Sequence, residues 1–336
     1  MRLFNNEEQL RKEGFIFVNS PRKEPPYRVF WNWDMLYECN YKCTYCDFAN
    51  GRLPTCSRQE QGIYNKATLS EWKEVWDRIF NQYYSGLVRL SGGEPSIHPL
   101  FYKLVRLLQE KHIVDITTNL NFDINYFIKN IPPDNIGISA SFHPQFSTLE
   151  NFLEKAMLFQ NRGYRISVCI VSYPPFLDKL EYFKGEFENR NFNFKISPFN
   201  GKYQGKDYPK AFSEEERRLL KKLANESPDP NMVLLNRKWY EWKVEKETSI
   251  KSKVCRMGQM YAKILPNGDV FRCCHPDSGF LGNIFVKDFK LLDAAEPCNV
   301  GNNCPCFKAM VAGEEDIWFP LWKAPEHSIY NQKRCI

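Results

Sequence analysis

The chain has 336 residues, of which 43% are hydrophobic and 26% are charged, and this composition excludes a fibrous or intrinsically disordered protein. Its length accommodates one large domain with a smaller second module. The formal net charge is +6, but the basic residues are spread along the chain rather than gathered in runs, which argues against a nucleic-acid partner.

Residues 1–26 form an N-terminal extension with Glu7, Glu8 and Glu13 and no apolar run, so they do not have the pattern of a secretory signal or a transit peptide. No stretch of about 18 apolar residues follows, and we expect no membrane partner. We therefore expect a cytoplasmic protein. In that reducing compartment the 12 cysteines indicate metal or redox chemistry rather than disulfides.

Between residues 28 and 197 the apolar pattern alternates between strand-like runs and helical periodicity, which is typical of a parallel α/β domain. Three of the helices begin at capping boxes, which pair Thr68 with Glu71, Ser147 with Glu150 and Ser213 with Glu216. A partial barrel and a doubly wound open sheet both fit this order, and both bind ligands at the carboxyl ends of the strands. The predicted strands are residues 28–36, 86–90, 113–118, 136–141, 165–171 and 192–196.

The first candidate site directly follows the first predicted strand. Cys39, Cys43 and Cys46 have the spacing C-x3-C-x2-C, with Tyr45 before the last thiol. A thiolate-bound zinc ion or iron–sulfur cube normally has four protein ligands. Three thiols would therefore leave one iron of such a cube without a protein ligand. A zinc site completed by a distant residue and three buried thiols are the alternatives.

The second candidate site is the run Gly92, Gly93, Glu94 and Pro95 at the end of the second predicted strand. The glycines allow the backbone to approach a ligand closely, Glu94 supplies a carboxylate acceptor and Pro95 fixes the turn. Taken alone, the run also fits an ordinary turn.

Together the two motifs resemble the radical S-adenosylmethionine (SAM) enzymes. The resemblance implies that the three cysteines hold a 4Fe-4S cluster, that SAM chelates the fourth iron, and that the second motif holds the amino group of SAM. Later strand ends would contact its ribose, carboxylate and adenine. The residues that the resemblance assigns to SAM binding are Tyr45, Gly92, Gly93, Glu94, Pro95, Asn119, Ser139, Ser141 and Ile170.

The resemblance also implies the architecture, which is α/β with a partial (β/α)6 TIM-like barrel over residues 27–212. A helical bridge would follow over residues 213–250. A small C-terminal cysteine-rich domain over residues 251–312 and a tail over residues 313–336 complete the prediction.

The C-terminal part contains a predicted hairpin with its turn at residues 266–268, across which Cys255 and Cys273 can face each other. This arrangement resembles the SPASM/twitch extensions of radical SAM enzymes, which hold an auxiliary 4Fe-4S cluster. The resemblance implies one such cluster, with Cys298 as a possible replacement for one of the last two ligands, and a zinc ribbon is the alternative. The implied ligands are Cys255, Cys273, Cys304 and Cys306.

Three further residues lie where chemistry is possible. Cys169 lies within the fifth predicted strand, where inward side chains line a barrel, and resemblance to radical SAM epimerases implies a hydrogen-atom donor. A small buried hydrophobe is the alternative. His98 and His143 each precede a proline, and they are candidates either for proton transfer or for a structural hydrogen bond.

The implied function is reductive cleavage of SAM to a 5′-deoxyadenosyl radical, which abstracts hydrogen from a small-molecule or peptide substrate. We expect an oxidation or a peptide crosslinking assisted by the auxiliary cluster, with flavodoxin or ferredoxin as an external reductant. The alternatives are a redox-neutral epimerase and, from another class, a non-catalytic iron–sulfur or zinc protein that binds partners or carries electrons.

Overall fold

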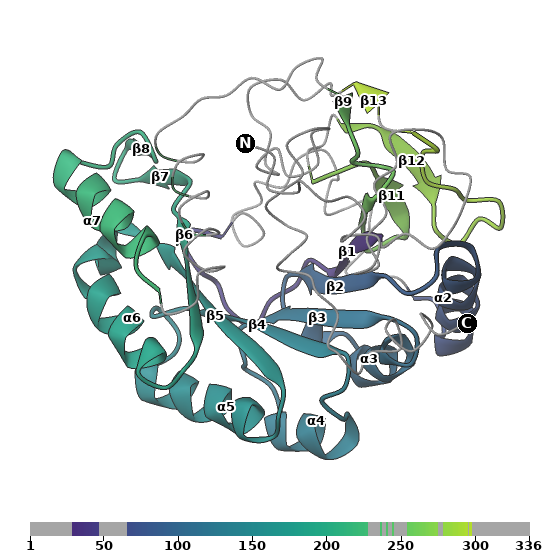
Figure 1. Ribbon diagram of the computed structural model, residues 1–336, viewed down its shortest axis with the longest axis horizontal. Coiled ribbons are helices and arrows are strands. Elements are labelled where there is room, and N and C mark those ends of the chain that lie inside the picture. Colours follow the sequence, from purple (N-terminus) through teal and green to yellow (C-terminus); the bar gives the residue numbers. More distant parts are fainter. Residues whose placement is uncertain are drawn as a thin grey trace, which may run out of the picture.

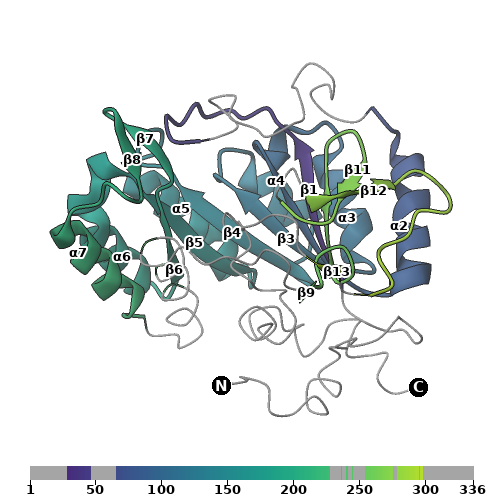
Figure 2. The same cartoon turned by 90° about the horizontal axis from the view of Figure 1, so that it is seen from above.

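The computed structural model describes residues 29–46, 66–227, 254–274, 278–294 and 296–297, together with residues 236, 240 and 244. A nine-stranded sheet, in the order β12-β11-β10-β1-β2-β3-β4-β5-β6, forms its centre. The sheet curves into an open barrel, with helices α2 to α7 along its outer face (Figure 1). In the perpendicular view α2 lies at one end of the molecule and α7 at the other (Figure 2).

Strands β1 to β6 pair in parallel, each with the next along the chain. The predicted alternation of strands and helices around a parallel sheet is therefore confirmed. The strands are β1 (Phe30–Leu36), β2 (Leu87–Gly92), β3 (Ile113–Thr118), β4 (Ile136–Phe142), β5 (Arg165–Ser172) and β6 (Asn193–Pro198). The helices are α2 (Leu69–Tyr83), α3 (Phe101–Gln109), α4 (Ile124–Asn130), α5 (Leu149–Asn161), α6 (Leu180–Glu188) and α7 (Glu214–Ala224), with 3-10 turns η1 (Pro95–Ile97) and η2 (Pro174–Lys179).

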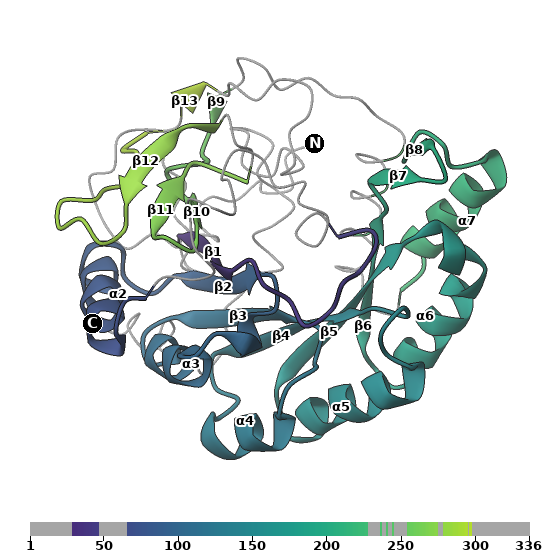
Figure 3. The same ribbon diagram turned by 180° about the vertical axis from the view of Figure 1, so that it is seen from behind.

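The C-terminal strands continue the same sheet. Strand β10 (Tyr261–Ile264) pairs in parallel with β1, and β11 (Asp269–Phe271) and β12 (Phe280–Asn283) follow in antiparallel order. Figure 3 shows β10 beside β1 from behind. The segment predicted as a separate small domain thus extends the barrel sheet at its β1 edge. The other short strands are β7 (Gly201–Tyr203), β8 (Lys206–Tyr208), β9 (Val254–Cys255) and β13 (Glu296–Pro297).

Three of the predicted segments lie wholly or mostly outside the described residues. They are the N-terminal extension, the C-terminal tail and the part of the bridge that follows α7. Among the described residues, no helix is long and apolar enough to cross a membrane.

Capping boxes start α2 and α7 as predicted, at Thr68 and Ser213. The box predicted at Ser147 is wrong, because the side chain of the next residue, Thr148, accepts from the backbone N–H of Asn151 and caps α5. Two adjacent hydroxyl residues compete for this position, and the one with extended backbone before the first helical turn caps the helix.

Aromatic packing fastens α2 to the outer face of β1. Trp31 and Trp33 are 0% and 1% exposed, and the ring of Trp33 lies 4.2 Å from that of Trp72. Burying one such side chain contributes about 2 to 3 kcal/mol. The outward side chains of β1 therefore belong to the apolar core, and the polar residues Asn32 and Asp34 occupy the alternating inward positions.

The inner face of the sheet is polar. Along β4 the outward Ile136, Ile138 and Ala140 are buried, whereas the inward Ser139 and Ser141 are half-buried. A barrel interior that is only a packed core is filled with branched apolar side chains. The serines here leave a face that can contact a polar ligand.

Candidate active site at the carboxyl ends of the parallel strands

The cysteine loop, residues 38–46, leaves the carboxyl end of β1. The backbone N–H of Cys46 donates to the carbonyl of Cys43 at 3.1 Å, and that of Tyr41 lies 3.4 Å from Cys39 Sγ. Cys43 is 4% exposed, and burial raises the pKa of its thiol to about 12. Burial also raises the pKa of Cys39. A metal must therefore displace protons from these thiols when it binds.

The donor set of this loop fits an iron–sulfur cluster, because it consists of thiols without hard oxygen ligands. Within the described ranges, no three Cys, His, Asp or Glu side chains are already grouped as ligands for a single metal ion. The three thiols lie on one short loop at the carboxyl edge of the parallel strands. Their role as ligands of an iron–sulfur cluster stays a prediction.

Gly92 and Gly93 bring the end of β2 against the start of the cysteine loop. A Cβ on Gly93 would lie 1.8 Å from the carbonyl oxygen of Glu38, and one on Gly92 would lie 2.2 Å from that of Leu36. Gly93 N–H donates to Leu36 O, and Glu94 N–H donates to Glu38 O, both at 2.8 Å. The close approach expected at these glycines is thus an approach to the chain itself, and contact with SAM stays a prediction.

The carboxylate of Glu94 joins the ends of β2 and β3. It is 1% exposed and accepts from Ser96 N–H at 3.1 Å, from the Thr118 hydroxyl at 2.9 Å and from Asn119 N–H at 2.8 Å. Burial raises the pKa of Glu94, and these donors oppose that rise by favouring the ionised form. Pro95, also buried, starts the η1 turn that follows.

Asn119 carries this network on to the cysteines. Its side-chain amide donates to Asn40 Oδ1 at 2.7 Å and lies 3.8 Å from Cys39 Sγ. The predicted residues Glu94 and Asn119 therefore meet the cysteine loop at one place.

His143, after β4, holds the other side of the loop. Its Nδ1 lies 2.7 Å from the hydroxyl of Tyr45 and 3.5 Å from Cys43 Sγ, and its ring stacks on that of Tyr45. Burial lowers the pKa of His143 to about 4, so the ring is neutral near pH 7. Tyr173, after β5, packs on Tyr45 from a third strand. The predicted proton-transfer candidate thus lies against the cysteine loop.

His98 has a local role. It is 3% exposed, and its Nδ1 accepts from Leu100 N–H at 3.1 Å in the turn before α3. Burial lowers its pKa to about 4. These contacts fit the structural alternative.

The inward residues of β4 and β5 lie below this edge. Ser139 donates to Asp115 Oδ1 at 2.8 Å, and Ser141 is in register with Cys169. Cys169 is half-buried on the inner face, and burial raises the pKa of its thiol. Ile170, its neighbour, is 1% exposed and belongs to the apolar core of the opposite face. The predicted SAM contact of Ile170 stays a prediction, and its side chain faces away from Ser141 and Cys169.

The predicted C-terminal hairpin exists, but its strands are β10 and β11, and Cys255 lies outside it on β9. Cys273 follows β11, and both cysteines are buried. The guanidinium of Arg272 links the two segments, since it donates to the carbonyls of Met257 at 3.0 Å and Cys255 at 3.5 Å. The other predicted ligands, Cys298, Cys304 and Cys306, lie outside the described residues.

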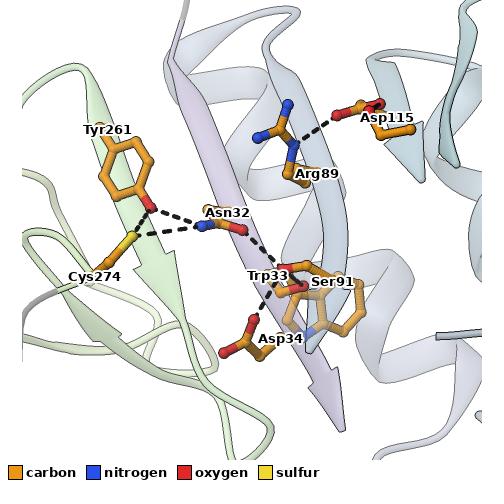
Figure 4. Close-up of polar contacts among 9 residues, drawn as sticks. Asn32, Trp33, Asp34, Arg89, Ser91, Asp115, Tyr261 and Cys274 are labelled. Atoms are coloured by element: carbon orange, nitrogen blue, oxygen red, sulfur yellow. Dashed lines mark hydrogen bonds and ion pairs between the residues drawn. The ribbon is translucent and has the colours of Figure 1, made fainter. Parts of the chain in front are cut away.

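Cys274 was not assigned from the sequence, and tertiary structure brings it to the edge of the inner face. Its Sγ lies 2.8 Å from the hydroxyl of Tyr261, which accepts from Asn32 Nδ2 at 2.8 Å (Figure 4). Ser91 donates to Asn32 Oδ1 and to Asp34 Oδ1. No short-range pattern marks this network, because its members come from β1, β2 and the C-terminal strands.

One protein family matches part of this chain. Residues 35–135, which contain both motifs, match the Radical SAM superfamily. A search of curated protein sequences finds no significant match.

Solved structures share the fold. SuiB of Streptococcus suis, bound to S-adenosylmethionine, superposes with a TM-score of 0.53 and 16% identity, over 83% of this chain and 66% of that chain. The protein anSMEcpe with bound AdoMet and Kp18Cys peptide gives a TM-score of 0.50 and 15% identity, over 87% of this chain and 83% of that chain. This chain thus spans slightly less than two thirds of the length of SuiB. The likeness at these identities is one of fold.

Proposed function

We propose that this chain is a radical SAM enzyme. The observation that carries the proposal is the joining of the two motifs. The end of β2 is hydrogen-bonded to the end of β1 through Gly93 and to the cysteine loop through Glu94, and Glu94 reaches Cys39 through Asn119 and Asn40. The match of residues 35–135 to the Radical SAM superfamily spans both motifs and supports it.

In this proposal Cys39, Cys43 and Cys46 supply three thiolates to a 4Fe-4S cluster. The bound cluster with SAM supplies reductive cleavage of SAM and a 5′-deoxyadenosyl radical that abstracts hydrogen. The residues of this chain orient and shield that chemistry. Glu94 holds the ends of β2 and β3 in place, and the ring of Tyr45 packs between those of His143 and Tyr173.

For the net reaction we propose an oxidation or a peptide crosslinking, assisted by an auxiliary 4Fe-4S cluster on Cys255, Cys273, Cys304 and Cys306, with Cys298 as a possible replacement. Cys255 and Cys273 are both buried, and the guanidinium of Arg272 donates to the carbonyl of Cys255, which supports a metal site beside these two thiols. A cytoplasmic reductant such as flavodoxin or ferredoxin would supply the electron.

A redox-neutral epimerase is the second candidate, and the inward position of Cys169 favours it. The test is turnover in deuterated water, in which a thiol donor transfers solvent deuterium to the product. Cys169→Ala should abolish this incorporation, and unchanged incorporation would exclude Cys169 as the donor.

The test of the main proposal is anaerobic reconstitution, a count of iron and sulfide per chain, and addition of dithionite and SAM. We expect about eight irons per chain and formation of 5′-deoxyadenosine. The triple variant Cys39→Ala, Cys43→Ala and Cys46→Ala should lose about four irons and all 5′-deoxyadenosine. Bound zinc, or full iron loading without 5′-deoxyadenosine, would favour the non-catalytic alternative.

A further inference from the structure

The turn after β4, residues 143–146, forms a fixed platform beside the cysteine loop. Its backbone closes on itself, because the N–H groups of Phe146 and Ser147 both donate to the carbonyl of His143, at 2.9 and 3.1 Å. The helix α5 begins directly after this turn, with Thr148 as its cap. The backbone that carries the His143 ring is therefore held between β4 and α5.

Two side chains of this turn fasten the cysteine loop on both sides of Cys43. The amide of Gln145 accepts from Thr44 N–H at 3.2 Å and donates to the Thr44 hydroxyl at 2.9 Å. The ring of Phe146 stacks on that of Tyr41, with 4.9 Å between the centroids and 15° between the planes. Tyr41 and Thr44 flank Cys43 in the sequence. These contacts keep the backbone of Cys43 beside the turn, so the turn stays within reach of the Cys43 sulfur when the loop binds a metal.

His143 directs one nitrogen toward the sulfur of Cys43. Its Nδ1 lies 3.5 Å from Cys43 Sγ and 2.7 Å from the hydroxyl of Tyr45. Stacking on the ring of Tyr45, with the planes 23° apart, fixes the orientation of the imidazole. The distance to Cys43 is within the range of an N–H···S hydrogen bond, because sulfur is a larger acceptor than oxygen.

Metal binding determines which partner donates in this contact. A neutral imidazole carries hydrogen on one nitrogen and accepts at the other, and a thiol is a weak donor. Cys43 loses its hydrogen when it binds a metal, and the resulting thiolate can only accept. Because Cys43 is 4% exposed, water has little access to this sulfur, and a buried charge without a hydrogen-bond donor is unfavourable. The tautomer with hydrogen on Nδ1 is therefore favoured in the metal-bound protein, and the hydroxyl oxygen of Tyr45 then accepts from the same N–H.

We propose that His143 donates a hydrogen bond from Nδ1 to the sulfur of metal-bound Cys43 and thereby raises the reduction potential of the 4Fe-4S cluster. The proposal rests on the proposed function, which supplies the cluster. A hydrogen bond to a ligand sulfur stabilises the reduced cluster more than the oxidised one, because reduction adds one negative charge. His143 is thus a positioning residue that acts through Cys43. A higher potential lets weaker one-electron donors reduce the cluster.

The test is a redox titration of the reconstituted full-length protein without SAM, in which EPR spectroscopy measures the reduced cluster. The signal of this cluster is the one absent from the triple variant Cys39→Ala, Cys43→Ala and Cys46→Ala. His143→Phe keeps an aromatic ring but has no donor. In this variant the ratio of reduced to oxidised cluster at the wild-type midpoint potential should fall about 10-fold, which is a downward shift of about 59 mV for one electron.

Two further variants separate the donor from packing. His143→Asn places an amide donor near the position of Nδ1 and should restore most of the lost potential. The control His112→Phe replaces a buried histidine at the amino end of β3 and should leave the potential unchanged.

A second measurement uses wild type labelled with ¹⁵N-histidine, so it does not depend on a folded His143→Phe protein. Pulsed EPR of the reduced cluster should detect a ¹⁵N coupling that His143→Asn lacks. A lack of coupling in wild type, or equal potentials in wild type and His143→Phe, would overturn the proposal. An equal fall of the potential in both His143 variants would also overturn it, because packing and not the donor would then set the potential.

Formation of 5′-deoxyadenosine, measured on the same preparations, separates this proposal from the proposed function. A cluster whose potential depends on His143, in a protein that forms no 5′-deoxyadenosine, supports the hydrogen bond and contradicts the radical activity. Formation of 5′-deoxyadenosine together with an unchanged potential in His143→Phe overturns the hydrogen bond alone. A protein that assembles no iron–sulfur cluster on the cysteine loop overturns both.

Discussion

Replacing Gly93 by alanine should separate the end of β2 from the cysteine loop. The added Cβ would lie 1.8 Å from the Glu38 carbonyl oxygen and 2.4 Å from its carbon, whereas real Cβ contacts are not shorter than 3.0 Å. The two backbone segments must therefore move apart by roughly 1 Å, since neither contact is with a flexible side chain. The φ of Gly93 is not positive, so the effect is steric.

That movement breaks two hydrogen bonds of 2.8 Å, from Gly93 N–H to Leu36 O and from Glu94 N–H to Glu38 O. A broken buried backbone hydrogen bond costs about 1 to 3 kcal/mol, so for two such bonds we expect the free energy of unfolding to fall by roughly 2 to 6 kcal/mol. The measurement is urea unfolding of the metal-free protein, followed by circular dichroism, together with SAM binding after reconstitution. Both stability and SAM binding should decrease.

The matched control is Gly185→Ala in α6, where an added Cβ meets nothing within 4 Å. This change should raise the free energy of unfolding by about 0.5 to 1 kcal/mol, because glycine is unfavourable in a helix interior. A Gly93→Ala protein within about 0.5 kcal/mol of wild type, with unchanged SAM binding, would refute the contact between the two motifs as we describe it.

Glu94→Gln places an amide donor where the carboxylate accepts three hydrogen bonds, so the free energy of unfolding, measured with urea, should fall by about 1 to 3 kcal/mol. The control Glu154→Gln, at an exposed position, should leave it unchanged, and equal effects of the two changes would contradict the role of Glu94. Burial lowers the pKa of His112 to about 3, below its unfolded value of about 6.5, so the unfolded state binds the proton first and stability falls as the pH drops through this range. At pH 5 the loss is up to about 2 kcal/mol, and His112→Phe should flatten the dependence of unfolding free energy on pH; an unaltered slope would exclude this histidine as its source. A Cys255→Ala, Cys273→Ala double variant should contain about four fewer irons per chain by elemental analysis, and an unchanged iron content would count against an auxiliary cluster.

Local sequence determined most of the barrel and the identity of its candidate site. Each of the six predicted strands overlaps one of β1 to β6, because alternating apolar runs and caps depend on residues a few positions apart. The capping box at Thr68 was predictable for the same reason, whereas at Ser147 two adjacent hydroxyl residues left the choice to backbone geometry. The cysteine spacing and the Gly92–Pro95 run were visible as motifs without any structure.

Tertiary structure decided how these parts meet. The hydrogen bond between Asn32 and Tyr261 joins residues 229 positions apart, and no periodicity relates β10 to β1. Likewise, the glycines of the second motif are required because β2 ends against Leu36 and Glu38, and His143 matters because it lies beside Tyr45 and Cys43. Bringing segments that are distant in the sequence together costs conformational entropy. This cost is offset only by the full set of contacts in the completed sheet, so no local stretch of sequence can specify which distant strands pair.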